Sequence, residues 1–242
     1  CRWSFTPAER TSRPAAPPRR DAARGAMRYL RRMAAVVVCG AGIAGISTAF
    51  HLVRRGITDV VIADPRPPLT LTSDKSTECY RNWWPNEPMI RLMARSIDLL
   101  DDYARESGNT FALNRRGYLY LTADPARLDS MATAAATASH AGAGDLRIHQ
   151  TNSAEYISAT PHGFEDSPTG ADLFLDGDIV RTHFPFVADN VVGALHARTA
   201  GWLSAQRLGT WMLEEAQAAG VQLLNTAVTA IGTNSTGVRN VT

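Results

Sequence analysis

Cysteine is scarce in this chain of 242 residues. Three cysteines are too few and too scattered to form a disulfide framework or a zinc site; they are Cys1, Cys39 and Cys79. A chain without disulfides suits a reducing compartment, so we expect a cytoplasmic location. The histidines also lack the spacing of a metal site or a catalytic triad, and we expect no bound metal. We interpret three of them as structural or exposed: His162, His183 and His196.

The body of the chain has no excess of positive charge. The net charge is +2, but residues 1–33 alone carry +7, from nine arginines against Glu9 and Asp21, so residues 34–242 sum to −5. A mildly acidic body excludes a broad basic surface, and we expect no nucleic-acid partner. Residues 1–26 are rich in arginine and proline and have no apolar periodicity, which predicts disorder.

We therefore interpret residues 1–33 as a disordered basic leader, for which two origins stay open. Arginine-rich, acid-poor leaders occur as organelle transit peptides. The alternative is that the leader is upstream translated sequence and that the protein starts at Met27 or Met33, which the first residue, a cysteine, favours.

Charge is entirely missing from residues 33–50, which follow three arginines within residues 28–32. A basic flank before an apolar run is typical of a secretory signal or a membrane span. The same run, however, contains Gly40, Gly42 and Gly45 with the spacing G-x-G-x-x-G, which is typical of a dinucleotide-binding turn. The surrounding pattern decides between the two interpretations.

That pattern is a strand, a helix and a second strand. Residues 36–38 are three valines, and β-branched residues favour strands. Apolar residues then recur at helical intervals from Ile43 to Val53, and a second β-branched run at residues 60–62 leads to Asp64. A membrane anchor has no need of this order, so we favour the nucleotide interpretation and expect no membrane association.

Each conspicuous position has a physical role in holding a dinucleotide. Gly40 permits a sharp turn out of the strand, and Gly42 lets a diphosphate approach the backbone. Gly45 and Ala49 are small, so the helix packs closely on the sheet, and its N-terminus offers free N–H groups to phosphates. Asp64 lies 24 residues after Gly40, where a carboxylate accepts hydrogen bonds from ribose hydroxyls.

The rest of the chain predicts a mixture of helices, strands and one long loop. Helices are expected over residues 86–106, over 125–140, and from a cap at Ser204 to about Ala219. Strands are expected in residues 111–124, where two are joined by a turn at 114–117, and in residues 173–180, 192–197 and 221–233. Residues 150–172 are polar and rich in proline and glycine, which favours a loop.

Three stretches together resemble the D-amino-acid, glycine and sarcosine oxidase group of FAD-dependent oxidoreductases. They are VVVCGAGIAGISTAFHLVRRGITDVVIAD (36–64), TSDKSTECYRNWWP (72–85) and the run from GALHARTAGW to LLNTAVTAIG (193–232). The resemblance implies an α/β protein with a Rossmann-like FAD-binding domain and a partial second α+β substrate domain. The implied segments are 34–106 for the first part of the FAD-binding domain, 107–195 for the substrate domain, and 196–242 for the second FAD-binding part.

The resemblance also implies FAD as the cofactor and a set of residues that bind it. These are Gly40, Ala41, Gly42, Ile43, Ala44, Gly45, Asp64, Pro65, Arg66, Ser73, Ser76, Thr77 and Val228. Within the set, Arg66 is implied near the adenine, and the backbone of Val228 is implied to contact it. The residues implied to lie beneath the diphosphate and flavin are Ser73, Ser76 and Thr77.

Arg81 matches a basic residue near the flavin ring of sarcosine-oxidase-like members, and we take it as the catalytic candidate. A positive charge there would stabilise the anionic reduced flavin. The alternative is a surface arginine paired with Glu78 or Asp74.

The neighbours of Arg81 also have two interpretations each. Cys79 lies near a position where one subgroup carries a histidine bonded to the flavin, but we expect a small buried thiol. Three aromatic residues wall the flavin or substrate, or belong to the core: Tyr80, Trp83 and Trp84.

The resemblance implies an enzyme that oxidises the C–N bond of a small amine or amino acid by hydride transfer to flavin, with O₂ or an unknown molecule as electron acceptor. Two alternatives stay open: an NAD(P)-dependent Rossmann dehydrogenase, and a non-catalytic flavoprotein that acts in the assembly of a complex. Members of the family return once more to the nucleotide domain, whereas this sequence stops at Thr242. We therefore expect the front portion of a longer enzyme, inactive alone.

Overall fold

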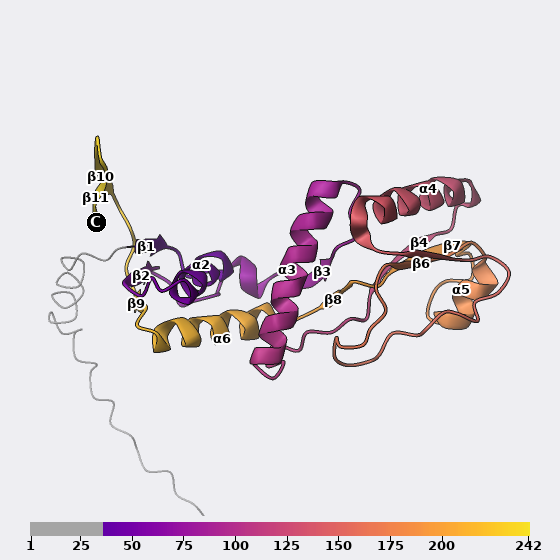
Figure 1. The fold of residues 1–242 in the computed structure, drawn as a ribbon, viewed down its shortest axis with the longest axis horizontal. Helices are drawn as coiled ribbons and strands as arrows, with labels where there is room; N and C mark the ends of the chain where they lie inside the picture. The colour runs from indigo at the N-terminus through magenta and orange to yellow at the C-terminus, as the bar shows by residue number, and fades with distance from the viewer. Residues whose placement is uncertain (1–35) are drawn as a thin grey trace, which may run out of the picture.

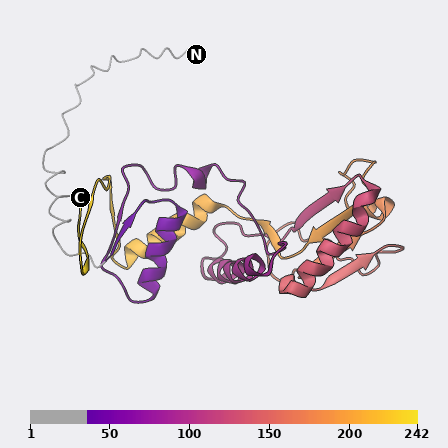
Figure 2. The same ribbon diagram turned by 90° about the horizontal axis from the view of Figure 1, so that it is seen from above.

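The computed structural model describes residues 36–242, so the predictions for residues 1–33 lie outside the described residues. The described chain is elongated, with one lobe at each end and a helix between them (Figure 1). Seen from above, helices cover a sheet in each lobe, and the middle helix is viewed nearly end-on (Figure 2). The fold is α/β, as predicted.

The first lobe is built on a three-stranded parallel sheet with the order β1-β2-β9. Its elements are β1 (Val36–Cys39), α2 (Ile43–Arg54), β2 (Val60–Ala63) and β9 (Gln222–Leu224). All four residues of β2 are buried, as expected for a parallel strand covered on both faces. The predicted strand, glycine turn, helix and second strand are confirmed. Among residues 36–242, no helix combines the length and apolar character needed to cross a membrane.

Two further helices complete the core of this lobe. Helix α6 (Ala205–Ala218) packs beside α2, and the hydroxyl of Ser204 caps it by accepting from the amide of Arg207 at 3.4 Å, as predicted. Helix α3 (Glu87–Glu106) contributes Ile97 and Tyr103 to the same core. Its first turn instead packs into the second lobe through Ile90. Helix α3 therefore joins the two hydrophobic cores.

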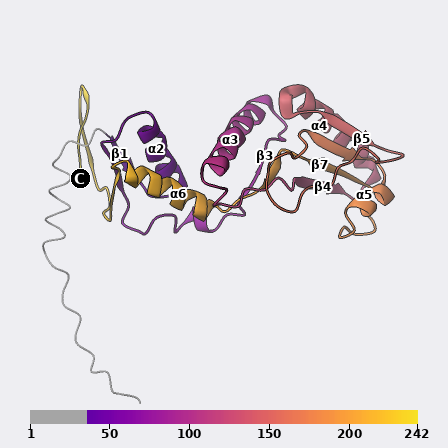
Figure 3. The same cartoon turned by 60° about the horizontal axis from the view of Figure 1, so that its bottom comes forward.

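The second lobe is a four-stranded mixed sheet with the order β4-β7-β6-β5. Its strands are β4 (Tyr118–Thr122), β5 (Leu146–His149), β6 (Ala171–Phe174) and β7 (Gly193–Ala197). Helix α4 (Leu128–Ala138) packs on the face that carries Leu173, and α5 (Gly177–His183) packs on the face that carries Phe174 (Figure 3). Strand β7 is wholly buried because both faces of the sheet are covered.

A two-stranded ribbon connects the lobes. It pairs β3 (Cys79–Arg81) with β8 (Ala200–Trp202) in antiparallel register. Both strands are only three residues long, and neither was predicted. The remaining elements are short 3₁₀ turns (Thr72–Asp74, Pro125–Arg127), a π turn (Ser139–Ala143), and a hairpin of β10 (Ile231–Asn234) and β11 (Gly237–Val241) that projects beyond β1 (Figure 1).

The segment before β4, residues 111–117, corrects one prediction. We expected a strand there and a hairpin turn at 114–117, but the segment is irregular. Ala112 has a φ of 55°, in the left-handed region, which breaks the extended geometry that a strand needs. The amides of Asn114 and Gly117 donate instead to carbonyl groups of β8, at 3.0 and 2.9 Å.

The stretch LFLDGDIV, residues 173–180, corrects a second prediction. It looked like one strand, but β6 ends at Phe174. The carboxylate of Asp176 then accepts hydrogen bonds from the amides of Asp178 and Ile179, at 2.8 and 3.1 Å, and begins α5. An aspartate cap outweighed the strand preference of the isoleucine and valine that follow it.

Two of the predicted domain limits can be located relative to the helices and strands of the structure. The limit between residues 106 and 107 coincides with the end of α3. The limit between residues 195 and 196 falls inside β7, so residues 196–197 belong to the second sheet.

Candidate cofactor site

The three glycines of the motif, at the end of β1 and the start of α2, have different structural roles. Gly40 has a φ of +107°, in the region that side chains disfavour, and it turns the chain out of β1. A Cβ atom on Gly45 would lie 2.0 Å from the carbonyl oxygen of Gly40, so the turn leaves no room there. Gly42 is extended, and a Cβ atom on it would meet nothing within 4 Å. Gly42 therefore faces open space.

The N-terminus of α2 faces the same space as a positive pole. The N-cap residue, Gly42, has no side chain to cap the helix, and the first turn holds no acidic residue. The hydroxyl of Ser73 accepts from the amide of Ile43 at 3.2 Å. Within residues 36–242, the amides of Gly42, Ala44 and Gly45 have no hydrogen-bond partner. Three free amides at the N-terminus of a helix form an anion-binding arrangement.

Asp64 lies directly after β2 and fastens the turn. Its Oδ2 accepts from the amide of Ala41 at 3.0 Å, and its Oδ1 accepts from the amide and Nε of Arg66 at 2.9 and 3.3 Å. The hydrogen bond from Ala41, followed by that from Arg66, holds the pKa of Asp64 below its usual range. The carboxylate is nearly buried and stays ionised, with lone pairs left for a further donor.

The other predicted cofactor residues are spread around this turn. Ser73 is buried and contacts α2, whereas the loop beyond it is exposed at Ser76 and Thr77. Pro65 is exposed beside Asp64. Val228 is half-buried in the segment between β9 and β10. The structure thus brings the glycines, Asp64, Arg66 and Ser73 together at the ends of β1 and β2.

Arg81 lies on the ribbon between the lobes, close to two aromatic rings. Its guanidinium carbon is 4.1 Å from the centre of the Trp84 ring and 5.1 Å from that of Tyr118. Its Nε is buried without a hydrogen-bond partner, and no carboxylate within residues 36–242 forms an ion pair with it. The alternative that Arg81 pairs with Glu78 or Asp74 is therefore wrong.

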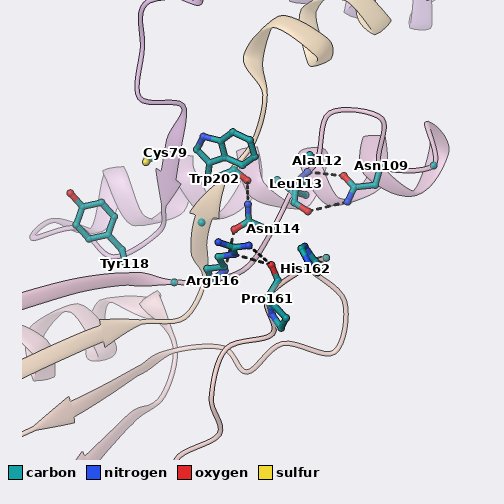
Figure 4. A pocket seen from close by; sticks show the side chains of 14 residues that line it. Cys79, Asn109, Ala112, Leu113, Asn114, Arg116, Tyr118, Pro161, His162 and Trp202 are labelled. Carbon is teal, nitrogen blue, oxygen red and sulfur yellow. Dashed lines mark hydrogen bonds between the residues drawn. The ribbon is translucent and has the colours of Figure 1, made fainter. Parts of the chain in front are cut away.

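Cys79 is exposed, which corrects the expectation of a buried thiol. It lies opposite Trp202 across the ribbon, and its Sγ donates to the carbonyl of Thr77 at 3.3 Å. Both side chains line a cavity of about 690 Å³ whose other wall carries Asn114 and Arg116 (Figure 4). A two-stranded ribbon has an uncovered face, and Cys79 points to it.

The aromatic residues after Cys79 divide between core and site. Tyr80 is buried, and its hydroxyl donates to the carbonyl of Asn114 at 2.5 Å. Trp83 is buried in the core of the second lobe. Only Trp84 contacts Arg81, and its ring Nε1 donates to the carbonyl of Arg81 at 3.0 Å. Tyr118 was not predicted as a partner of Arg81.

Comparison with protein families decides the identity. The family described as FAD dependent oxidoreductase matches residues 35–242, most of the chain. The chain belongs to this family. FAD is the cofactor of FAD-dependent oxidoreductases, and the described residues fit it: three free amides, open space at Gly42 and no acid in the first turn of α2 suit its diphosphate. A buried carboxylate stands at the end of the neighbouring strand.

Solved structures support the fold of this FAD-dependent oxidoreductase. L-proline dehydrogenase from P. horikoshii is 21% identical, with a TM-score of 0.67, over 85% of this chain and 48% of that one. L-amino acid deaminase from Proteus vulgaris is 19% identical, with a TM-score of 0.66, over 85% and 43%. Glycine oxidase from Geobacillus kaustophilus is 18% identical, with a TM-score of 0.65, over 84% and 50%. The chain thus spans about half the length of these proteins. Comparison with curated proteins gives no match.

Proposed function

We propose that this FAD-dependent oxidoreductase oxidises the C–N bond of a small amino acid or amine by hydride transfer to flavin. Solved structures of similar fold are named for proline, glycine and L-amino acids, which supports substrates of that class. The observation that carries the proposal is Arg81, a cation on the ribbon between the lobes that has no counter-ion among residues 36–242. An unpaired guanidinium is ready to bind an anion.

The chain's own residues bind and orient in this proposal. The amides of Gly42, Ala44 and Gly45 hold the diphosphate, and Asp64 accepts from a ribose hydroxyl. The bound flavin supplies the hydride acceptor. Arg81 places positive charge where negative charge develops on reduction, and it attracts the carboxylate of an amino acid. We propose O₂ as the electron acceptor, and the cytoplasmic location stays a prediction.

A substrate panel tests the proposal. Full-length native protein is mixed with amines and amino acids without O₂, and loss of the oxidised flavin absorbance is followed. We expect bleaching by at least one amino acid, and peroxide release when O₂ is admitted. Bound FAD with no bleaching across the panel would overturn the proposal in favour of a non-catalytic flavoprotein. A protein that binds no flavin, but reduces NAD(P)⁺, would favour the nicotinamide alternative.

A further inference from the structure

We propose that Trp84 and Tyr118 are positioning residues that clamp Arg81, fixing the plane of its guanidinium so that only the edge of the group is offered to an anion. The inference rests on the proposed role of Arg81. It gives Trp84, for which two interpretations were open, a specific role, and it adds Tyr118 to the site.

The clamp consists of two aromatic rings that both lie close to the cation. The guanidinium carbon lies 4.1 Å from the ring centre of Trp84 and 5.1 Å from that of Tyr118, within the range of cation–π attraction. A guanidinium is planar and its N–H groups lie in its plane. Two rings packed against the group therefore restrict how that plane can turn.

Each ring is itself anchored. The Nε1 of Trp84 donates to the carbonyl of Arg81 at 3.0 Å, so the indole folds back over the side chain of the residue that it bonds. Tyr118 lies on β4, where it pairs with Ala197 of β7, and its ring is 4.9 Å from the ring of Tyr120. One side of the clamp comes from the loop after β3, and the other comes from the second sheet.

The unpaired Nε of Arg81 indicates why the side chain has to be held in place. A buried donor without a partner is costly, and most native structures avoid it. An arginine that merely covered surface would turn its donors to water or to a carboxylate. We propose that the clamp holds Nε in this position, so that the cation is already oriented when an anion arrives.

The first measurement needs neither FAD turnover nor a substrate. Nuclear magnetic resonance of full-length native protein follows the Nε–H of Arg81 while acetate, a simple carboxylate, is added. We expect slow exchange of this proton with water and an upfield position caused by the rings. Replacing Trp84 or Tyr118 by leucine should speed the exchange and weaken acetate binding about 10-fold, in the range of a partly desolvated cation–π contact.

Matched variants at Trp84 and Tyr118 separate the effect of the aromatic ring from the effect of the polar group that it carries. Tyr118→Phe keeps the ring and should bind acetate as the wild type does. Trp84→Phe keeps a ring but loses the bond to the Arg81 carbonyl, so its loss should be smaller than that of Trp84→Leu. Trp202→Leu removes an exposed tryptophan of β8 that does not touch Arg81, and should change nothing.

Catalysis supplies the second measurement. We expect the leucine variants to raise KM for an amino acid more than they lower kcat. Leucine variants that fold by circular dichroism, yet keep wild-type acetate affinity and Nε–H exchange, would overturn the clamp. If one leucine variant does not fold, the other decides in the same way. A wild type that oxidises no amine or amino acid would overturn the proposed function alone, since the acetate titration still decides on the clamp.

Discussion

The amide of Ala41 donates to Oδ2 of Asp64 at 3.0 Å, across the ends of two neighbouring parallel strands. The residue expected to hold a ribose thus also closes the turn that receives the diphosphate. Both functions depend on an ionised carboxylate, which the bonds from Ala41 and Arg66 favour by lowering the pKa of Asp64.

Replacing Asp64 should therefore affect stability and cofactor affinity together. Asp64→Ala leaves the Ala41 amide without its partner, and we expect a loss of about 1–3 kcal/mol in the free energy of unfolding. FAD affinity should fall as well. Urea unfolding and FAD titration measure the two effects. Asp98→Asn, at an exposed position of α3, is the control and should alter neither. An Asp64→Ala protein as stable as the wild type would contradict the fastening role.

Gly45 should tolerate no side chain. A Cβ atom there would lie 2.0 Å from the carbonyl oxygen of Gly40, a backbone atom that cannot swing away. We expect Gly45→Ala to lose at least about 1–3 kcal/mol of stability, as overpacked sites do. Gly42→Ala is the matched control, because nothing lies within 4 Å of its added atom. Thermal unfolding of both variants checks this difference, and equal melting temperatures would refute it.

Arg81 should matter for turnover rather than for folding. It forms no ion pair with the described residues, so Arg81→Met should fold normally while kcat/KM for an amino acid falls by about 10²–10³. Arg81→Lys keeps the charge but not the flat donor edge, and it should recover only part of the loss. Arg91→Met, on the exposed surface of α3, controls for loss of charge. An Arg81→Met protein with wild-type kinetics would exclude the assigned role.

His196 should make the second lobe sensitive to acid. Its Nε2 donates to the carbonyl of Arg116 at 2.9 Å, and its Nδ1 lies 3.1 Å from the Tyr156 hydroxyl and 3.2 Å from NH1 of Arg198. Burial, and next the charge of Arg198, lower the pKa of His196 to about 4. The folded state thus resists a proton that the unfolded state accepts near its ordinary pKa of 6.5.

The sign of the effect follows. Above pH 6.5 the titration of His196 does not change the free energy of unfolding. As the pH falls below 6.5 the free energy of unfolding decreases, and the decrease ends below about pH 4. The total loss from this group is about 3 kcal/mol. Urea unfolding between pH 7 and 4 measures it, and the slope of the wild type should exceed that of His196→Gln. Equal slopes would show that folding does not lower the pKa of His196.

Local pattern was enough to predict the cofactor turn. The strand, glycines, helix and second strand lie within residues 36–64, and each signal acts over a few residues. The cap at Ser204 was found for the same reason. The ribbon was missed because β3 and β8 are three residues each and more than 100 positions apart, so their pairing leaves no periodic signal. The exposure of Cys79 depends on that ribbon.

The surroundings of Arg81 show the same limit of prediction from sequence, which is the contact between distant positions. Trp84 lies three positions away and was among the candidates, whereas Tyr118 reaches Arg81 only through the packing of β4. The alternation in YLYLT places Tyr118 and Tyr120 on one face of β4, and this was the available signal. It does not identify what that face contacts. Sequence thus located the cation and one candidate ring, and only the fold supplied Tyr118 and the contacts of both rings with Arg81.

The most direct test of the central claim is the FAD content of full-length protein in which Gly42 is replaced by valine. The backbone at Gly42 is extended and the space beside it is empty, so valine should leave folding and melting temperature unchanged while it blocks the diphosphate. Exposed Thr48→Val, one and a half turns further along α2, is the control. We predict a folded, colourless Gly42→Val protein beside a yellow control. A Gly42→Val protein with the full flavin absorbance of the wild type would contradict the assignment of this turn as the FAD site.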